Sequence, residues 1–227
     1  VALFGRDFRA PRSWRGNLQW SGPVLGNRFS LTVDGTYSLN QQQQGQVDLN
    51  FAGVERLALA DEGGRPVFVD DTSIVPGSGQ VDPRAARRST AFNRVTQLTS
   101  DLTGVSRQLS INLAPAQFTT GFGWSASYVY GNNREQFWGF QSTDGDPRAR
   151  DWSRAAFDSR HQLQYSLRWN LWDAVRIGWF GSFRSGNPYT PTVSGDINGD
   201  GASFNDRAFV FDPNTVTDAA VRDGIRA

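Results

Sequence analysis

The 227-residue sequence predicts an all-β fold, in which about six long antiparallel strands form a segment of a transmembrane β-barrel with long extracellular loops. From Phe29 to Leu39, apolar side chains occupy almost every second position, and small or polar residues lie between them. This alternation is expected of a strand with one apolar and one polar face. The alternation recurs in runs of about ten residues with aromatic ends and very unequal connections, as in barrels that span an outer membrane.

Composition is compatible with that prediction and excludes a helical membrane protein. Only 38% of the residues are apolar, and no run approaches the roughly 20 consecutive apolar residues of a membrane-spanning helix. A barrel tolerates this composition because its inward-facing residues are polar. The 8 Trp and 16 Phe residues fit a membrane-interface belt, or alternatively the core of a soluble β-sandwich.

Charge and cysteine content exclude several other classes. The 23 basic and 22 acidic residues nearly cancel, so we expect no nucleic-acid partner. There is no Cys, which excludes disulfides and thiol-based sites, and a single histidine, His161, makes a multi-histidine zinc site unexpected. The chain has no Met, even at position 1, and opens without a signal peptide, so we expect a piece of a longer precursor.

Six strands follow from the alternating runs, and their connections differ strongly in length. A turn-forming run at 22–27, a connection at 114–119 and a tight turn at 171–174 are short. Long polar segments follow the second, fourth and sixth strands, and the first of these runs for some fifty residues without an obvious amphipathic element, far beyond a usual connection. The predicted strands cover about residues 13–21, 28–39, 92–113, 120–131, 160–170 and 175–184.

The alternation of short and long connections predicts an orientation. In an outer-membrane barrel the short turns face the periplasm and the long loops lie outside, so both chain ends would face outward. Arg168, between Leu167 and Trp169, would be costly in lipid or in a dry core but not in a wet lumen. Because bacterial single-chain barrels start at eight strands, we expect residues 1–227 to be one partial β-barrel domain, a fragment of a larger barrel.

Several motifs resemble the C-terminal half of TonB-dependent outer-membrane receptors, in particular the large receptors with an N-terminal carboxypeptidase-regulatory-like domain. The most specific pair is Ser-Gly-Asn-Pro-Tyr-Thr at 185–190 and Asp-Ile-Asn-Gly-Asp-Gly at 196–201. The other stretches that carry the resemblance are 95–102, 106–109, 158–161 and 205–209.

This resemblance implies part of a barrel of roughly 22 strands, closed by an N-terminal plug, in the cell outer membrane. Such a receptor imports a large or scarce nutrient, such as a siderophore, glycan or peptide, with energy transmitted by TonB. This chain would be about a quarter of the wall, without plug or N-terminal domain. The implied partners are outer-membrane lipid, lipopolysaccharide, an extracellular nutrient and, through the missing plug, the TonB complex. The alternatives are a passive porin or structural outer-membrane barrel, and a secreted β-sandwich that binds calcium and carbohydrate.

The run at 196–201 also matches the first half of a calcium-binding loop. Asp196, Asn198 and Asp200 stand at positions 1, 3 and 5, from which oxygen side chains converge on one point. The glycine at position 6 allows the sharp turn that such a loop requires. Calcium is therefore the one candidate cofactor.

The second half of the loop departs from the calcium motif. Position 12 is Arg207 instead of a bidentate Glu. The missing oxygens could come from Asn205, Asp206 or Asp212. The alternative is a metal-free loop in which Asp and Asn side chains bond their own backbone.

Two further sets of loop residues are candidates for ligand binding. Arg84, Arg87 and Arg88 could attract an anionic ligand such as a ferric siderophore or acidic glycan, or contact lipopolysaccharide phosphates, or form a solvated loop face. The aromatic residues of the second long loop could stack on a sugar, or could pack the loops together. These aromatic residues are Phe137, Trp138, Phe140 and Trp152.

No catalytic site is expected. The carboxylate pairs Asp70 with Asp71 and Asp144 with Asp146 fall in polar loops, without the apolar surroundings that raise the pKa of a catalytic acid. His161, beside Arg160 at the end of a strand, is expected at the rim of the sheet. The sequence therefore predicts a non-enzymatic protein.

Overall fold

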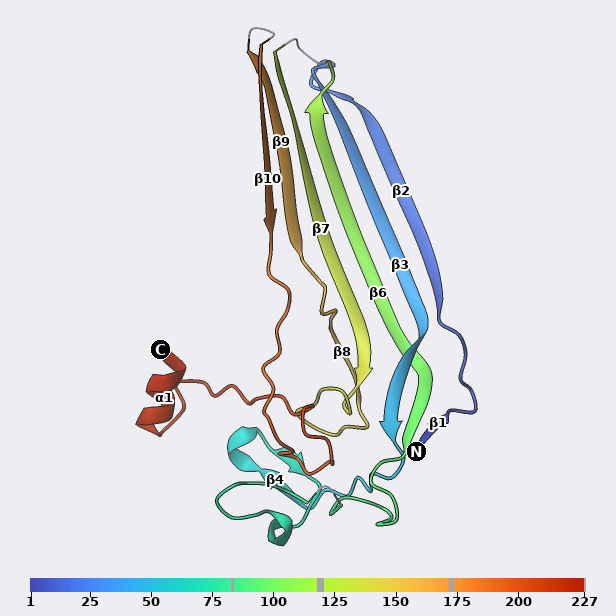
Figure 1. The fold of residues 1–227 in the computed structure, drawn as a ribbon, viewed down its shortest axis with the longest axis vertical. Helices are drawn as coiled ribbons and strands as arrows, with labels where there is room; N and C mark the ends of the chain where they lie inside the picture. The colour runs from blue at the N-terminus through green and yellow to red at the C-terminus, as the bar shows by residue number, and fades with distance from the viewer. Residues whose placement is uncertain (83, 118–120, 172–173, 227) are drawn as a thin grey trace.

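The computed structural model describes residues 1–82, 84–117, 121–171 and 174–226. It is a mostly-β structure with one large curved sheet of long strands and a group of folded loops at one end (Figure 1). The helices among these residues are all too short to span a membrane. The elements are β1 (Ala2–Phe4), β2 (Arg12–Val24), β3 (Phe29–Asp48), β4 (Leu57–Leu59), β5 (Arg65–Val67), β6 (Thr96–Pro115), β7 (Phe122–Trp138), β8 (Arg150–Arg154), β9 (His161–Leu171), β10 (Val175–Arg184) and α1 (Ala219–Arg226), with 3-10 turns at Ala60–Glu62 and Asp71–Ser73.

The long strands form an up-and-down antiparallel sheet in the order β10-β9-β7-β6-β3-β2. All six predicted strands are present, so the prediction is confirmed as far as a mostly-β protein with one large antiparallel sheet of long strands. The sheet is open and not closed into a barrel, because β2 and β10 each pair on one side only within the described residues. The predicted start of the fourth strand at Thr120, part of the 114–119 connection and the centre of the 171–174 turn lie outside the described residues.

The connections between the strands segregate by length. The turn between β2 and β3 lies at one end of the sheet, while the long segments and both chain termini lie at the other (Figure 1). The turn is tight because Leu25, Gly26 and Asn27 all adopt positive φ angles. The predicted alternation of short and long connections is therefore reproduced along the described part of the chain.

The strand register aligns apolar side chains on one face of the sheet. Trp20 lies opposite Val33, which in turn lies opposite Ile111. The same face carries Leu18, which is 82% exposed, and Trp179, which is 61% exposed. Because residues directly opposite each other share a face, a one-residue slip would turn every apolar group to the other side.

The opposite face of the sheet is polar and partly hydrogen-bonded across the strands. Asn17 Nδ2 donates to Asp34 Oδ2 at 3.2 Å, and the hydroxyls of Ser125 and Ser166 lie 2.8 Å apart. Arg168, also on this face, lies opposite glycines on both sides, at positions 123 and 178. No second sheet is layered over either face in the described residues, since the only other sheet is the short β4–β5 pair.

The main hydrophobic core lies away from the strands, in the loops. Phe51 packs edge-on against Phe68 and Phe140, with ring centroids 5.0 and 5.7 Å apart. We call residues 49–95, 139–149 and 191–209 the loop module. Its buried apolar side chains are Phe51, Val67, Phe68, Val69, Ala86 and Phe140.

The first long segment is folded, although its sequence shows no obvious amphipathic element. It contains the β4–β5 pair and most of this core. Strands of three residues are too short to produce an alternating pattern, and their apolar residues find partners in distant segments. Helix α1 at the C-terminus was also not predicted; it has only eight residues, none of them buried, and so gives a short pattern.

Candidate functional site at the loop end of the sheet

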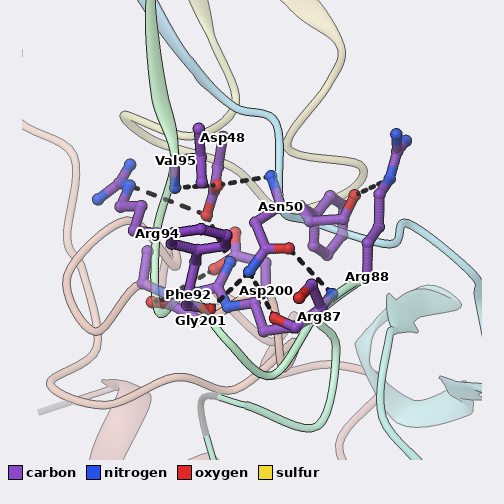
Figure 2. Close-up of polar contacts among 12 residues, drawn as sticks. Asp48, Asn50, Arg87, Arg88, Phe92, Arg94, Val95, Asp200 and Gly201 are labelled. Carbon is purple, nitrogen blue, oxygen red and sulfur yellow. Dashed lines mark hydrogen bonds and ion pairs between the residues drawn. The ribbon is translucent and has the colours of Figure 1, made fainter. Parts of the chain in front are cut away.

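The first part of the candidate site is a carboxylate at the end of β3. Asp48 Oδ1 accepts hydrogen bonds from the backbone N–H groups of Asn50 (3.0 Å) and Val95 (3.1 Å). Its Oδ2 pairs with the guanidinium of Arg87 and lies 4.0 Å from Arg94 Nε. Figure 2 shows these groups converging from the two ends of the first long segment. Asp48 therefore fixes the beginning and the end of that segment to the sheet.

Asn50 completes this junction. Its Nδ2 group donates to the carbonyl oxygens of Ser89 (2.9 Å) and Phe92 (2.6 Å), and its Oδ1 accepts from the Ser89 N–H (3.0 Å). Both donors and one acceptor position of the amide are thus satisfied in a residue that is buried. The arrangement closes a loop of about forty residues by side-chain bonds to backbone groups.

Arg87 joins this junction to the run predicted as a calcium loop. Besides its ion pair with Asp48, its Nη2 donates to the carbonyl oxygen of Gly201 at 3.3 Å (Figure 2). The backbone of Phe68 also donates to the carbonyl of Asn198 at 2.8 Å. We call residues 196–206 the aspartate loop; it is packed on the core of the loop module.

The aspartate loop folds around the carboxylate of its first residue. Asp196 accepts from the backbone N–H groups of Asp200 (3.0 Å) and Gly201 (2.7 Å). Gly199 and Gly201 have φ angles of +71° and +84°, which suit glycine. The Cβ of any other residue at Gly199 would lie 2.7 Å from Val69 Cγ1.

The remaining polar side chains of the loop are buried beside Asp200. Its Oδ1 accepts from the Ala202 N–H (2.8 Å), and its Oδ2 accepts from Asn205 Nδ2 (2.6 Å). Asn198 Nδ2 lies 3.5 Å from the same Oδ2. Asp206 Oδ2 accepts from the backbone N–H of residue 197 at 2.8 Å. The structure thus brings the five predicted calcium-loop residues together in the same loop, four of them buried and Asp196 partly buried.

Burial dominates the electrostatics of this group. Burial, and then repulsion from Asp200, raises the pKa of Asp196 to about 6, against hydrogen bonds that favour the charged form. Burial raises the pKa of Asp206 to about 7, with repulsion from the other two carboxylates adding to the effect and Arg65 opposing it. Burial also raises the pKa of Asp200. Charge of one sign is therefore concentrated in a poorly solvated place.

The nearest cation to Asp206 is shared with another carboxylate. Arg65 Nη1 lies 3.6 Å from Asp206 Oδ1, while Arg65 Nε lies 2.9 Å from Glu62 Oε2. Counting only Asp, Glu, His and Cys side chains, no group of three in the described residues is spaced to enclose a metal ion. Any ion held by the aspartate loop would therefore require amide and backbone oxygens as well as carboxylates.

The three predicted anion-binding arginines have different environments. Arg87 is directed inward, with a side chain that is only 3% exposed, and is engaged by Asp48. Arg88 is exposed, although its Nε donates to the Phe51 carbonyl at 3.0 Å, and Arg84 is exposed. Anion binding remains a prediction for the two exposed residues, while Arg87 has a structural contact that the sequence did not suggest.

The four predicted aromatic candidates also differ: Phe140 is buried in the core of the loop module, and Phe137 lies against the Arg207 guanidinium. Trp138 packs against the loop-module core, and its Nε1 donates to Thr99 Oγ1 at 3.2 Å. Trp152 is exposed on β8, with the Arg134 guanidinium 5.9 Å from its ring. Trp138 thus has the packing role that was the alternative for these aromatics, and only Trp152 is presented to solvent.

The remaining polar candidates are placed as the sequence suggested. The side chains of Asp70 and Asp144 are both 64% exposed, and their nearest ion-pair contacts are long, at 3.8 Å to Arg56 and 4.0 Å to Arg207. His161 begins β9, where its Nδ1 lies 2.7 Å from the hydroxyl of Tyr128. No signal in the sequence singled out Asp48, Asn50 or Arg65, because their importance depends on contacts with segments far along the chain.

Comparison of the chain with protein-family models, with curated proteins and with solved structures gives no match.

Proposed function

We propose that this chain forms part of the wall of a TonB-dependent receptor in the outer membrane, which takes up a large or scarce nutrient such as a siderophore, glycan or peptide. The observation that carries the proposal is the sheet of long strands with one exposed apolar face and one polar face. The motif pair at 185–190 and 196–201 supports the receptor class. The loop module would lie outside the cell and the turns in the periplasm.

The apolar face has the composition of a lipid-facing barrel surface. Leu18, Trp179 and Phe183 are between 61% and 82% exposed, and such contiguous apolar surface is uncommon on soluble monomers. The six long strands have 10 to 20 residues, enough for the roughly 9–11 residues with which a tilted strand crosses lipid. Tyr128 and His161 meet at the loop end of this face, at the level where amphipathic aromatics favour an interface.

The polar face has the composition of a barrel lumen. Arg168 and the serine pair Ser125–Ser166 would be unfavourable against lipid, where no water compensates a polar group. In a hydrated lumen they need no special partner. The loop module, with Arg84, Arg88 and Trp152 exposed, would supply contacts to the external nutrient.

The alternatives differ in what they require. A secreted β-sandwich requires two layered sheets, whereas the described ranges contain one large sheet and, apart from it, only the short β4–β5 pair. A passive porin or structural barrel would share the wall but would not need energy from TonB.

Lipid exposure can be tested with single cysteines, because the chain has no natural Cys. In the full gene product reconstituted in bilayers, a fluorophore on Leu167→Cys should be quenched by a lipid-borne quencher. A fluorophore on the adjacent Arg168→Cys should be quenched by an aqueous one. Equal aqueous quenching at both positions would exclude the transmembrane arrangement.

Energised uptake needs a separate measurement. Cells expressing the full gene product should accumulate its nutrient, identified by growth on candidate siderophores, glycans and peptides, only when TonB is present. Equal uptake in cells that lack TonB would favour the passive porin.

A further inference from the structure

Two buried oxygens in the aspartate loop have no hydrogen-bond donor. They are Asn205 Oδ1, in a residue that is 3% exposed, and Asp206 Oδ1, in a residue that is fully buried. A buried oxygen without a donor destabilises the fold unless another group compensates it. The Nδ2 group of Asn205 donates to Asp200 Oδ2 at 2.6 Å and to the Gly139 carbonyl at 3.3 Å, so the carboxamide is held through its nitrogen while its buried oxygen has no donor.

The loop also carries more negative than positive charge. Asp200 and Asp206 are buried and Asp196 is partly buried. Arg65 Nη1 lies 3.6 Å from Asp206 Oδ1, while Arg65 Nε lies closer, at 2.9 Å, to Glu62 Oε2. Arg87 pairs with Asp48, and its charge also opposes the larger effect of burial, which raises the pKa of Asp200. Buried carboxylates are normally paired or coordinate a metal.

The donor set indicates which cation would fit. The side chains that meet here offer carboxylate and amide oxygens, with no sulfur or imidazole, and oxygen ligands of this kind suit calcium. Arg207, at the position where a calcium loop carries its closing Glu, is turned away: its Nε donates to Ser142 Oγ at 3.0 Å and its guanidinium lies 5.2 Å from the Phe137 ring. The last oxygens would therefore come from residues 205 and 206.

We propose that the aspartate loop is a calcium site, with Asp196, Asn198 and Asp200 as ligands from its first half and Asn205 and Asp206 as ligands from its second half. A half-turn of the Asn205 carboxamide places its unpartnered oxygen beside Asp200, and breaks the bonds from Nδ2 to Asp200 and to the Gly139 carbonyl. Two oxygens placed together repel each other without a cation and are both ligands with one. Asn205 is thus the residue that distinguishes a metal site from a loop closed by hydrogen bonds alone.

The test uses hydrogen–deuterium exchange of backbone amides in residues 194–208 of the full gene product. Calcium chloride is added alone, with magnesium chloride and EGTA as comparisons. At a calcium concentration ten times the Kd, exchange through loop opening should slow about tenfold. Because the readout is local, calcium bound by lipopolysaccharide does not affect it.

Three variants sharpen the result. In Asn205→Asp, exchange in EGTA should be faster than in wild type, because two carboxylates then lie together. Calcium should slow the exchange of this variant to the wild-type rate. Asp200→Asn should lose the calcium response, and Asp212→Asn, in an exposed turn outside the loop, should keep it. An unchanged wild-type loop in calcium, or fast exchange in Asn205→Asp that calcium does not restore, would overturn the proposal. Neither result bears on whether the sheet lies in a membrane.

Discussion

At the scale of single residues, the loop module depends on side chains that bond backbone groups far along the chain. Asp48 and Asn50 hold residues 87–95, and Arg65 Nη2 donates to the carbonyl of Arg207 at 2.5 Å. Such bonds fix irregular backbone that has no ladder of its own. The module therefore has specific conformational requirements at a few positions.

Gly199 is one such position. Gly199→Ala should lower the free energy of unfolding of the loop module by about 2 kcal/mol or more, because an alanine pays for φ = +71° and its Cβ meets Val69 at 2.7 Å. Gly77→Ala is the matched control, since Gly77 has φ = +85° but nothing within 4 Å. It should cost only about 1 kcal/mol. Urea-dependent proteolysis of the module measures the free energy of unfolding of both variants. Equal decreases in the two variants would show that the contact with Val69 has no effect on stability.

Asp158 should make the second long loop sensitive to acid. Burial opposes its ionisation, but hydrogen bonds from Arg154 (2.8 Å) and Asn133 (2.9 Å) outweigh this and lower its pKa. Because the folded pKa lies below the unfolded value, the stabilisation is complete above the unfolded pKa and is lost as the pH falls through the folded pKa. Asp158→Asn should cost roughly 2 kcal/mol near neutral pH.

Pepsin cleavage within residues 139–158 measures this effect. In wild type, cleavage should rise steeply as the pH falls below about 4, the ordinary pKa of an aspartate, after correction for the activity of pepsin on a denatured substrate. The variant should be cleaved readily throughout and show little of that dependence. A variant with the same pH profile as wild type would show that another carboxylate is responsible.

At the scale of elements, the alternation of apolar and polar residues predicted the strands whose side chains divide regularly between two faces. The boundaries of β9 and β10 match the prediction within one residue, since Leu163 to Leu171 alternate regularly. The loop-end extension of β3 was missed because its glutamine run has no apolar alternation and contains a bulge with Gln42 at φ = +57°. The sequence predicted which residues of the aspartate loop come together, because they lie close to one another in the chain.

The core of the loop module could not be predicted in this way. It joins Phe51 and Val67 of the first long segment to Phe140 of the second, and these residues have no common period. Phe51→Ala should destabilise the module by roughly 3–5 kcal/mol, the range for buried aromatic truncation, while leaving the strands intact. Phe157→Ala, at an exposed position, is the control and should have little effect.

The measurement compares two signals from the full gene product. Proteolysis of residues 49–95 should accelerate strongly in Phe51→Ala, whereas the heat-modifiable migration in gels that the proposed barrel would show should not change. If both signals change together, the loop module and the sheet unfold as one cooperative unit, which would contradict an independent loop core.

At the scale of the whole molecule, burial is distributed in an unusual way. Among the buried apolar side chains of the described residues, only Leu102 lies on a long strand, close to the loop end, while the sheet leaves large apolar side chains exposed along its length. A soluble domain stabilises its sheet by covering one face. Here the covered part is the loop module, so the sheet itself requires stabilisation from its surroundings and from strands at its edges.

The edges of the sheet provide the last prediction. β2 and β10, of 13 and 10 residues, each leave one side without a ladder in the described part of the chain, and long exposed edges promote association with other chains. Residues 1–227 expressed alone should therefore aggregate in water and should not form a monomer in detergent that survives without added strands. The full gene product in the same detergent is the control and should be monodisperse and heat-modifiable. The contradicting result is a soluble, folded monomer of residues 1–227, observed by light scattering and circular dichroism without detergent. It would exclude both the need for further strands and the proposed lipid contact of the apolar face, because Leu18, Trp179 and two unpaired strand edges would then all be stable in water.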